Sequence, residues 1–133
     1  MIFIDSSFIL GLFNDKDDNH PKIIKLLKFM PEIINEKKAI NNIILTEVLN
    51  KIHKNYYRNV RTEIINFILN IDKIYYLEND QYLNAIKLME TYKYTMNYSD
   101  CLILLTMEKN NINTIISFDN NFDKIKGIKR IYV

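Results

Sequence analysis

The order of apolar and polar residues along the chain predicts β-strands that alternate with α-helices. Short apolar runs with polar residues at both ends predict strands at residues 2–4, 39–45, 73–77, 113–116 and 129–133. Apolar residues three or four positions apart predict helices at 6–13, 46–57 and 61–70, and helices that begin near residues 21, 79 and 99. We therefore expect an α/β fold, a three-layer α/β/α sandwich around a mostly parallel sheet of about five short strands.

Several helix boundaries can be assigned from residue types. Thr46 is the expected N-cap of the helix after the second strand, with Glu47 in its first turn. Asn79 or Asp80 is expected to cap the helix after the third strand. In the second helix, four apolar residues are expected to face the core as one stripe: Ile23, Ile24, Leu27 and Met30.

The composition fits a soluble globular protein. The chain has 133 residues, of which 48% are hydrophobic and 26% charged, enough for a real core. Two glycines and two prolines leave no flexible linker, so we expect one domain over residues 1–133. No apolar run approaches the roughly 20 residues that cross a bilayer, the start of the chain lacks a signal-peptide pattern, and a single cysteine cannot form an internal disulfide. We expect a cytoplasmic protein with no membrane segment.

Four acidic residues stand where predicted elements begin or end. Asp5, Glu47 and Asp119 follow predicted strands, and Asp100 opens the helix before the fourth strand. Taken singly, each has a structural explanation, because acids at N-caps and in first helical turns are stabilising by roughly 0.3–1 kcal/mol. Taken together they suggest a site, because the carboxyl ends of parallel strands share one edge of the sheet and ligands bind there. Asp100 reaches this edge only if its loop folds over from the neighbouring strand.

A cluster of carboxylates at that edge predicts a metal site. Converging carboxylates repel one another and raise each other's pKa values unless a cation neutralises them. Oxygen ligands without His or Cys suit Mg²⁺ or Mn²⁺ rather than zinc. Such a cation activates water and holds a phosphate, which is the chemistry of phosphodiester hydrolysis. Nearby hydroxyls could orient the carboxylates or bind metal-held water, although serine also simply favours turns: these are Ser6, Ser99 and Ser117.

The chain resembles the PIN domains, and within them the VapC-type toxins of toxin–antitoxin pairs. The resemblance covers nearly the whole chain and rests on five short motifs in family order and spacing: Ile4–Ser7, His20-Pro21, Thr46–Leu49, Tyr98–Ile103 and Ser117–Phe122. It implies a PIN-like fold and a Mg²⁺- or Mn²⁺-dependent endoribonuclease. The catalytic and metal-binding acids would be Asp5, Glu47, Asp100 and Asp119. The resemblance further implies an RNA substrate, a homodimer and a cognate antitoxin protein that holds the enzyme inactive.

The chain departs from the family pattern at one position. Many relatives carry a further Asp where Asn121 stands. An amide oxygen can still support the site but adds less charge, which leaves open whether one metal ion or two bind. Asp123 lies nearby but outside the motif.

A basic segment at residues 51–61 is the candidate RNA contact. Its cations, with no acid among them, are Lys51, Lys54, Arg58 and Arg61, and Tyr56 and Tyr57 lie between them. Cations contact phosphates, and tyrosine stacks on unpaired bases. Basic helix faces are usually solvated, however, and the same surface could bind an antitoxin peptide. The net charge of +2 adds no general attraction for nucleic acid.

Other functional classes fit less well or stay open. A phospho-acceptor signalling domain needs an acid pair near the first strand and an Asp after a central one, but the first strand supplies only Asp5 and the third ends at Leu77-Glu78. A phosphatase with an Asp-x-Asp nucleophile fails because Ser7 occupies the second position. A housekeeping RNA-processing nuclease and a catalytically inactive binding module remain alternatives to a toxin.

Overall fold

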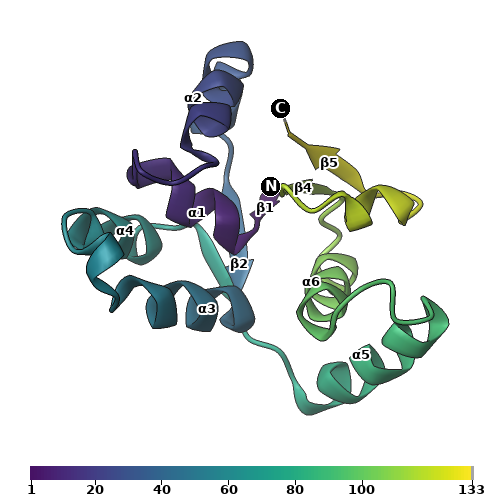
Figure 1. The fold of residues 1–133 in the computed structure, drawn as a ribbon. Coiled ribbons are helices and arrows are strands. Elements are labelled where there is room, and N and C mark those ends of the chain that lie inside the picture. Colours follow the sequence, from purple (N-terminus) through teal and green to yellow (C-terminus); the bar gives the residue numbers. More distant parts are fainter. Residues whose placement is uncertain (133) are drawn as a thin grey trace.

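The computed structural model describes residues 1–132, which form a sheet between two layers of helices (Figure 1). The strands of this part of the chain lie in the order β3-β2-β1-β4-β5, and every pairing is parallel. They span Ile2–Ile4 (β1), Lys38–Asn41 (β2), Lys73–Tyr75 (β3), Thr114–Ile116 (β4) and Lys129–Ile131 (β5). The expected three-layer α/β sandwich with a parallel sheet of five short strands is confirmed.

The helices form two groups, one on each face of the sheet. Helix α1 packs against α2, α3 and α4, whereas α5 packs against α6 (Figure 1). The α-helices span Ser6–Phe13 (α1), His20–Phe29 (α2), Asn42–Ile52 (α3), Arg61–Leu69 (α4), Asn79–Thr91 (α5) and Tyr98–Lys109 (α6). Short 3₁₀ helices span Pro31–Ile34 (η1), Asn55–Tyr57 (η2) and Asn120–Lys124 (η3). Among the described residues, none of the helices has the length and hydropathy that a membrane crossing requires.

Strand β1 lies at the centre of the sheet, and the core is built around it. Its three residues are all buried, as expected for a strand covered on both faces. Helix α6 is also largely enclosed, since Cys101, Leu102, Ile103 and Met107 are buried around its circumference. Asp5 directly follows β1 and Asp100 lies in the first turn of α6, so two deeply buried elements position both acids.

The strands end at one level along the carboxyl edge of the sheet. Ile4 pairs with Ile116, and Ile116 pairs with Ile131, so β1, β4 and β5 are in register at their ends. On the other side, Asn41 at the end of β2 pairs with Tyr75 at the end of β3. The residues that follow β1, β4 and β5 therefore lie along one edge: Asp5, Ser117 and Tyr132.

The boundary between β2 and α3 differs from the prediction. The strand ends at Asn41 rather than at residue 45, and the helix begins at Asn42. The Asn41 side chain caps the helix by accepting hydrogen bonds from the amides of Ile43 and Ile44, at 3.1 and 3.0 Å. Thr46 is therefore not the N-cap; its hydroxyl donates to the Asn42 carbonyl inside the helix. The predicted helix at 46–57 ends at Ile52 and is followed by η2.

Other predicted boundaries were wrong by a few residues. Glu78, rather than Asn79 or Asp80, caps α5 through a capping box with Gln81. Of the predicted inward stripe, Ile23 is buried, Leu27 and Met30 are half-buried against the core, and Ile24 is exposed. Leu26 is buried in its place. The third strand ends at residue 75, and β5 ends at residue 131, so position 133 of the predicted last strand lies outside the described residues.

Candidate active site

The four acids predicted from the sequence are placed by four different elements. Asp5 is the N-cap of α1, directly after β1. Asp119 is the N-cap of η3, in the loop that leaves β4. Asp100 lies in the first turn of α6. Glu47 lies one turn further into α3 than expected, because that helix begins at residue 42.

The hydroxyl of Ser117 joins the ends of β1 and β4. It donates to Asp5 Oδ2 at 2.8 Å and accepts from the Asp119 amide at 3.0 Å. The other Asp5 oxygen, Oδ1, accepts from the Ser6 amide at 2.8 Å. Asp119 Oδ1 in turn accepts from the Asn121 amide at 2.9 Å. Asp5 and Asp119 are thus held by one hydrogen-bond network across neighbouring strands.

Asp100 is a buried acid with a carboxylate oxygen that has no hydrogen-bond partner. It is only 6% exposed, and its Oδ2 is buried without a hydrogen-bond partner. Its amide is held by the Asn97 side chain, which caps α6 and accepts at 2.8 Å. Leaving a buried oxygen without a partner costs about 1–3 kcal/mol, and more when the group is charged. The charged Asp100 carboxylate is therefore unfavourable unless it loses its charge or gains a partner.

Burial and neighbouring charges raise the pKa of Asp100 to about 7. Burial is the largest cause, followed by the charges of Asp119 and Asp5 and by a hydrogen bond to Asp119 that needs a proton between the two carboxyls. When Asp100 and Asp119 are both ionised, neither carboxylate can donate a hydrogen bond to the other, so Asp100 Oδ2 has no partner. The pKa of Asp5 is also raised, first by burial and then, against its hydrogen bonds, by the charges of Glu47 and Asp119.

These shifts show that the four carboxylates share one electrostatic environment. Among residues 1–132, however, no three acidic, His or Cys side chains are arranged as they stand to hold a metal ion. A rotation of carboxylate side chains can close a metal site, and the buried Asp100 oxygen and the mutual charge effects show that the acids already lie close to one another. The all-oxygen donor set fits Mg²⁺ or Mn²⁺.

The other residues predicted to support the acids differ in the contacts that they make with them. Ser117 is fully buried and contacts two acids, as described above. Ser6 acts through its backbone amide, and Ser99 lies half-buried in the first turn of α6 beside Asp100. The side-chain oxygen of Asn121 accepts from Lys124 Nζ at 3.0 Å, so its support for Asp119 comes from its backbone.

The basic segment at 51–61 divides into exposed cations and one structural arginine. Lys51, Lys54 and Arg58 are exposed. Arg61 instead donates to the carbonyls that end α3: Ile52 at 2.6 Å, His53 at 3.1 Å and Lys54 at 3.2 Å. Arg61 therefore caps α3, and the structure gives no reason to keep it among the RNA contacts.

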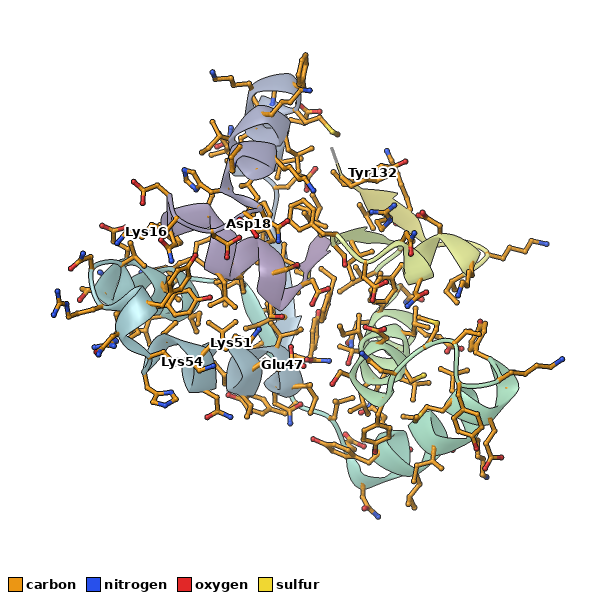
Figure 2. The ribbon with its side chains drawn as sticks, in the orientation of Figure 1. Lys16, Asp18, Glu47, Lys51, Lys54 and Tyr132 are labelled. Atoms are coloured by element: carbon orange, nitrogen blue, oxygen red, sulfur yellow. The ribbon has the colours of Figure 1, made fainter. Side chains whose placement is uncertain are left out.

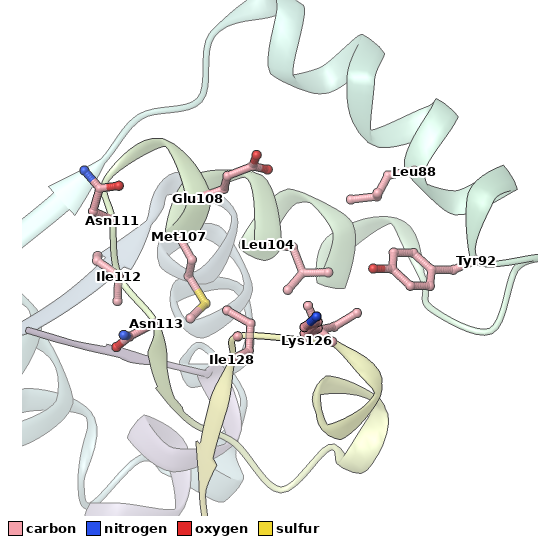
Figure 3. Close-up of a pocket in the computed structure, with 12 residues that line it drawn as sticks. Leu88, Tyr92, Leu104, Met107, Glu108, Asn111, Ile112, Asn113, Lys126 and Ile128 are labelled. Atoms are coloured by element: carbon pink, nitrogen blue, oxygen red, sulfur yellow. The ribbon is translucent and has the colours of Figure 1, made fainter.

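A pocket of about 560 Å³ lies away from the four acids, between α5, α6 and the loop before β5 (Figure 3). Leu104, Met107 and Ile112 form an apolar part of its wall, and Glu108 and Lys126 are charged residues of its lining. Residues 111–113 and 128 precede β4 and β5, so this pocket lies toward the amino edge of the sheet. It is not the site of the chemistry that the carboxylates suggest.

Sequence reasoning missed several residues that hold the acids in place. Asn97 stands three positions before Asp100, the ordinary spacing of an N-cap, and could have been found from that signal. Asp123 was set aside as outside the motif and Arg130 was not singled out, yet Arg130 binds both Asp123 and the backbone of Ser117. No local pattern indicates that last contact, since it joins a loop to the edge strand of the sheet.

Comparison with known proteins assigns the chain to a family. Its fold is similar to VapC20 of Mycobacterium tuberculosis, described as a toxin that cleaves the sarcin-ricin loop, with a TM-score of 0.78 and 18% identity over 100% of both chains. It is also similar to VapBC2 of Rickettsia felis, solved with a DNA fragment of its promoter, with a TM-score of 0.67 and 17% identity over 98% of both chains. No curated protein matches the sequence. The model of the PIN domain matches residues 2–128, and the chain therefore belongs to the PIN domain family.

Proposed function

We propose that this protein is a Mg²⁺- or Mn²⁺-dependent endoribonuclease whose metal-binding acids are Asp5, Glu47, Asp100 and Asp119. The observation that carries the proposal is the buried, unpartnered Oδ2 of Asp100, in a carboxyl whose pKa is raised by burial and by Asp119 and Asp5. Acids that perturb one another in this way are typical of functional sites. The family supports the same chemistry, because PIN domains are typically nucleases that use divalent metals.

The chain's own residues prepare the site for a cation and a phosphodiester. Ser117 and the Ser6 amide fix the orientation of Asp5, and the Asn121 amide fixes that of Asp119. Because its pKa is about 7, the carboxyl of Asp100 is only partly ionised near neutral pH, and a bound cation would favour the ionised form and release the proton. A bound Mg²⁺ or Mn²⁺ would lower the pKa of a water molecule and neutralise charge on the phosphate.

The RNA strand is proposed to continue from the acids along α3. Glu47 and Lys51 are four residues apart, which places them on one face of α3. Lys54 follows just beyond the end of the helix, where it precedes η2. Figure 2 shows Glu47, Lys51 and Lys54 following one another along α3 and past its end. Both lysines are exposed and form no ion pair within residues 1–132. They are positioned to bind the phosphates next to the one that is cleaved.

Replacing both Lys51 and Lys54 by alanine is expected to raise the KM for RNA about tenfold with little change in kcat. The lysines would bind substrate and transition state alike, so their loss weakens binding without altering the chemical step. KM should also become less dependent on salt, because fewer counterions are released on binding. The double variant Lys25→Ala, Lys28→Ala, which removes two exposed charges from α2, is the control. Equal effects of both double variants would rule out a specific track along α3.

We further propose that the protein is the toxin of a toxin–antitoxin pair, acts as a homodimer and is held inactive by a cognate antitoxin. The support is the likeness in fold to VapC20, described as a toxin, and to VapBC2, whose name pairs toxin and antitoxin. The RNA target is not carried over from VapC20, because 18% identity supports the fold alone. A small gene next to this one that encodes a tightly binding inhibitor would distinguish a toxin from a housekeeping nuclease.

The proposed reaction is tested by the ends of the RNA products. Purified protein with 5 to 10 different unpaired and structured RNAs, on the order of tens of nucleotides each, should cleave at least one of them in Mg²⁺ or Mn²⁺ and none in EDTA. Attack by water should leave a 5′-phosphate and a 3′-hydroxyl, and a 2′-deoxy substitution at the cleaved position should not block the reaction. Products with a 2′,3′-cyclic phosphate, or full activity in EDTA, would contradict the proposal.

A further inference from the structure

Arg130, on β5, is an unusually buried cation. Its side chain is only 6% exposed, although arginine is rarely buried unless it is paired. Its Nε and Nη2 atoms donate to the two oxygens of Asp123, both at 2.8 Å, and its Nη1 donates to the carbonyl of Ser117 at 3.1 Å. The ring of Tyr132 lies 3.8 Å from the centre of the guanidinium and covers one of its faces. Each of the three guanidinium nitrogens thus donates a hydrogen bond.

These contacts connect Arg130 to both ends of the loop that carries Asp119. Ser117 begins the loop, directly after β4, and Asp123 lies near the end of η3. Ser117 is also the residue whose hydroxyl binds Asp5 Oδ2 and the amide of Asp119. A shift of the Ser117 backbone would therefore move the hydrogen bonds to two of the proposed metal-binding acids at once.

Charge as well as geometry links Arg130 to the site. The pKa of Arg130 is raised above its usual value, first by the hydrogen bond to Asp123 and more weakly by the charge of Asp119. The pKa of Asp123 is lowered, first by its hydrogen bond to Arg130. Asp123 thus stays charged and stays paired, so it anchors the loop without competing for the cation that Asp119 would bind.

We propose that Arg130 is a positioning residue: through the Ser117 carbonyl and the Asp123 carboxylate it fixes the loop that presents Asp119, and thereby the ability of the site to bind its metal ion. The proposal rests on the proposed function, because it concerns the same site. A planar guanidinium presents its donors in a fixed fork that fits two carboxylate oxygens and a carbonyl together, whereas the ammonium of lysine is a compact point charge without this fork.

The variant Arg130→Lys keeps the charge and removes the fork. We expect kcat for RNA cleavage to fall about 10–100-fold, with KM changed less than about twofold, because residues that support metal ligands typically have effects of this size on metal affinity or activity. The Mn²⁺ concentration that half-saturates the protein, measured by calorimetry without RNA, should rise by about the same factor. Lys129→Gln, which removes an exposed cation one residue earlier on β5, is the matched control and should leave both values unchanged.

A readout without metal separates positioning from overall stability. Hydrogen exchange of the Asp119 and Asn121 amides, followed by NMR well below the melting temperature, should be faster in Arg130→Lys, while amides of β1 exchange as in the wild type. Asp123→Asn is a milder second variant that leaves the contact between Arg130 and Ser117 in place. Exchange of the Asp119 and Asn121 amides should also be faster in this variant, but by a smaller factor. The double variant should be no worse than Arg130→Lys alone, because the two residues act as a pair.

The outcomes distinguish this inference from the proposed function. If wild-type protein cleaves no RNA, the proposed function fails, and the Mn²⁺ titration and amide exchange still test the role of Arg130. If Arg130→Lys binds Mn²⁺ like the wild type and the Asp119 amide exchanges at the wild-type rate, the positioning role is wrong. A uniform rise in exchange across the sheet would likewise overturn it, since that pattern indicates a general loss of stability.

Discussion

The variant Asp5→Asn is expected to lose metal-dependent RNA cleavage, with kcat falling on the order of 10³-fold or more. Asparagine has the shape of aspartate but no charge, so it removes a metal ligand with little change in volume. Its amide oxygen can still accept from the Ser6 amide, and its NH₂ group can donate to the Ser117 hydroxyl in place of the present bond. The cap of α1 and the link between β1 and β4 should therefore survive.

This variant needs a control that removes a carboxylate elsewhere. Asp80→Asn changes an exposed acid in the first turn of α5 and should cleave RNA as the wild type does. Initial rates in Mn²⁺, with circular dichroism spectra of both variants, provide the comparison. Undiminished cleavage by folded Asp5→Asn protein would remove Asp5 from the proposed mechanism and with it the present choice of metal ligands.

The sheet and the placement of two acids could be predicted because they depend on local patterns. A short, fully apolar run such as Ile2–Ile4, followed at once by an acid and a helix, indicates a buried parallel strand. Asp119 follows β4 after two intervening residues and caps the 3₁₀ helix η3. Parallel topology then brings the two together without further information, and Ser117 makes the contact between them.

The start of α3 could not be predicted because its first turn is apolar. Asn42–Leu45 reads equally well as the end of a strand or the start of a helix, since periodicity cannot separate the two over four residues. Tertiary contacts decide it: the Asn41 side chain caps the helix and also donates to the buried Thr106 hydroxyl at 3.1 Å. Glu47 is placed in the second turn of α3 as a result.

The support of the acidic loop depends on contacts between distant segments. Motif reasoning set Asp123 aside because it lies outside the family pattern, whereas the structure pairs it with Arg130 on a different element. In the same way, Arg61 belongs by composition to a basic segment, and only its contacts with the last carbonyls of α3 show that it is a cap. Residue type indicates what a side chain can do, and its partners in the fold decide which of those roles it takes.

Without divalent metal, the protein is expected to become less stable as pH rises from about 4 to about 7, because of Asp100. Its pKa is about 7 in the folded protein and near the ordinary aspartate pKa of 3.8 when unfolded. Between these values the folded state holds a proton that the unfolded state has released, so the free energy of unfolding falls as pH rises. A shift of about three pKa units corresponds to at most about 4 kcal/mol, fully lost above pH 7. The raised pKa of Asp5 acts in the same direction.

The variant Asp100→Asn should remove most of this pH dependence. Its amide can donate to Asp119 at every pH, as the protonated carboxyl does only at low pH. In EDTA at pH 8 we expect the variant to be more stable than the wild type by about 1–3 kcal/mol, and near pH 4 the two should be similar. At pH 8, millimolar Mn²⁺ should stabilise the wild type but not the variant, because only the wild type offers the charged ligand.

Urea unfolding at several pH values, with and without Mn²⁺, measures these differences. Asp80→Asn is again the matched control, since it removes an acid from the first turn of an exposed helix and should change stability by no more than about 1 kcal/mol. If Asp100 is a metal ligand, as proposed, its cost in the absence of metal is the stability that the fold gives up to keep a charged ligand in its core. If Asp100→Asn is the less stable protein at pH 8, the carboxylate has partners within the fold, and its buried oxygen is not held for a cation.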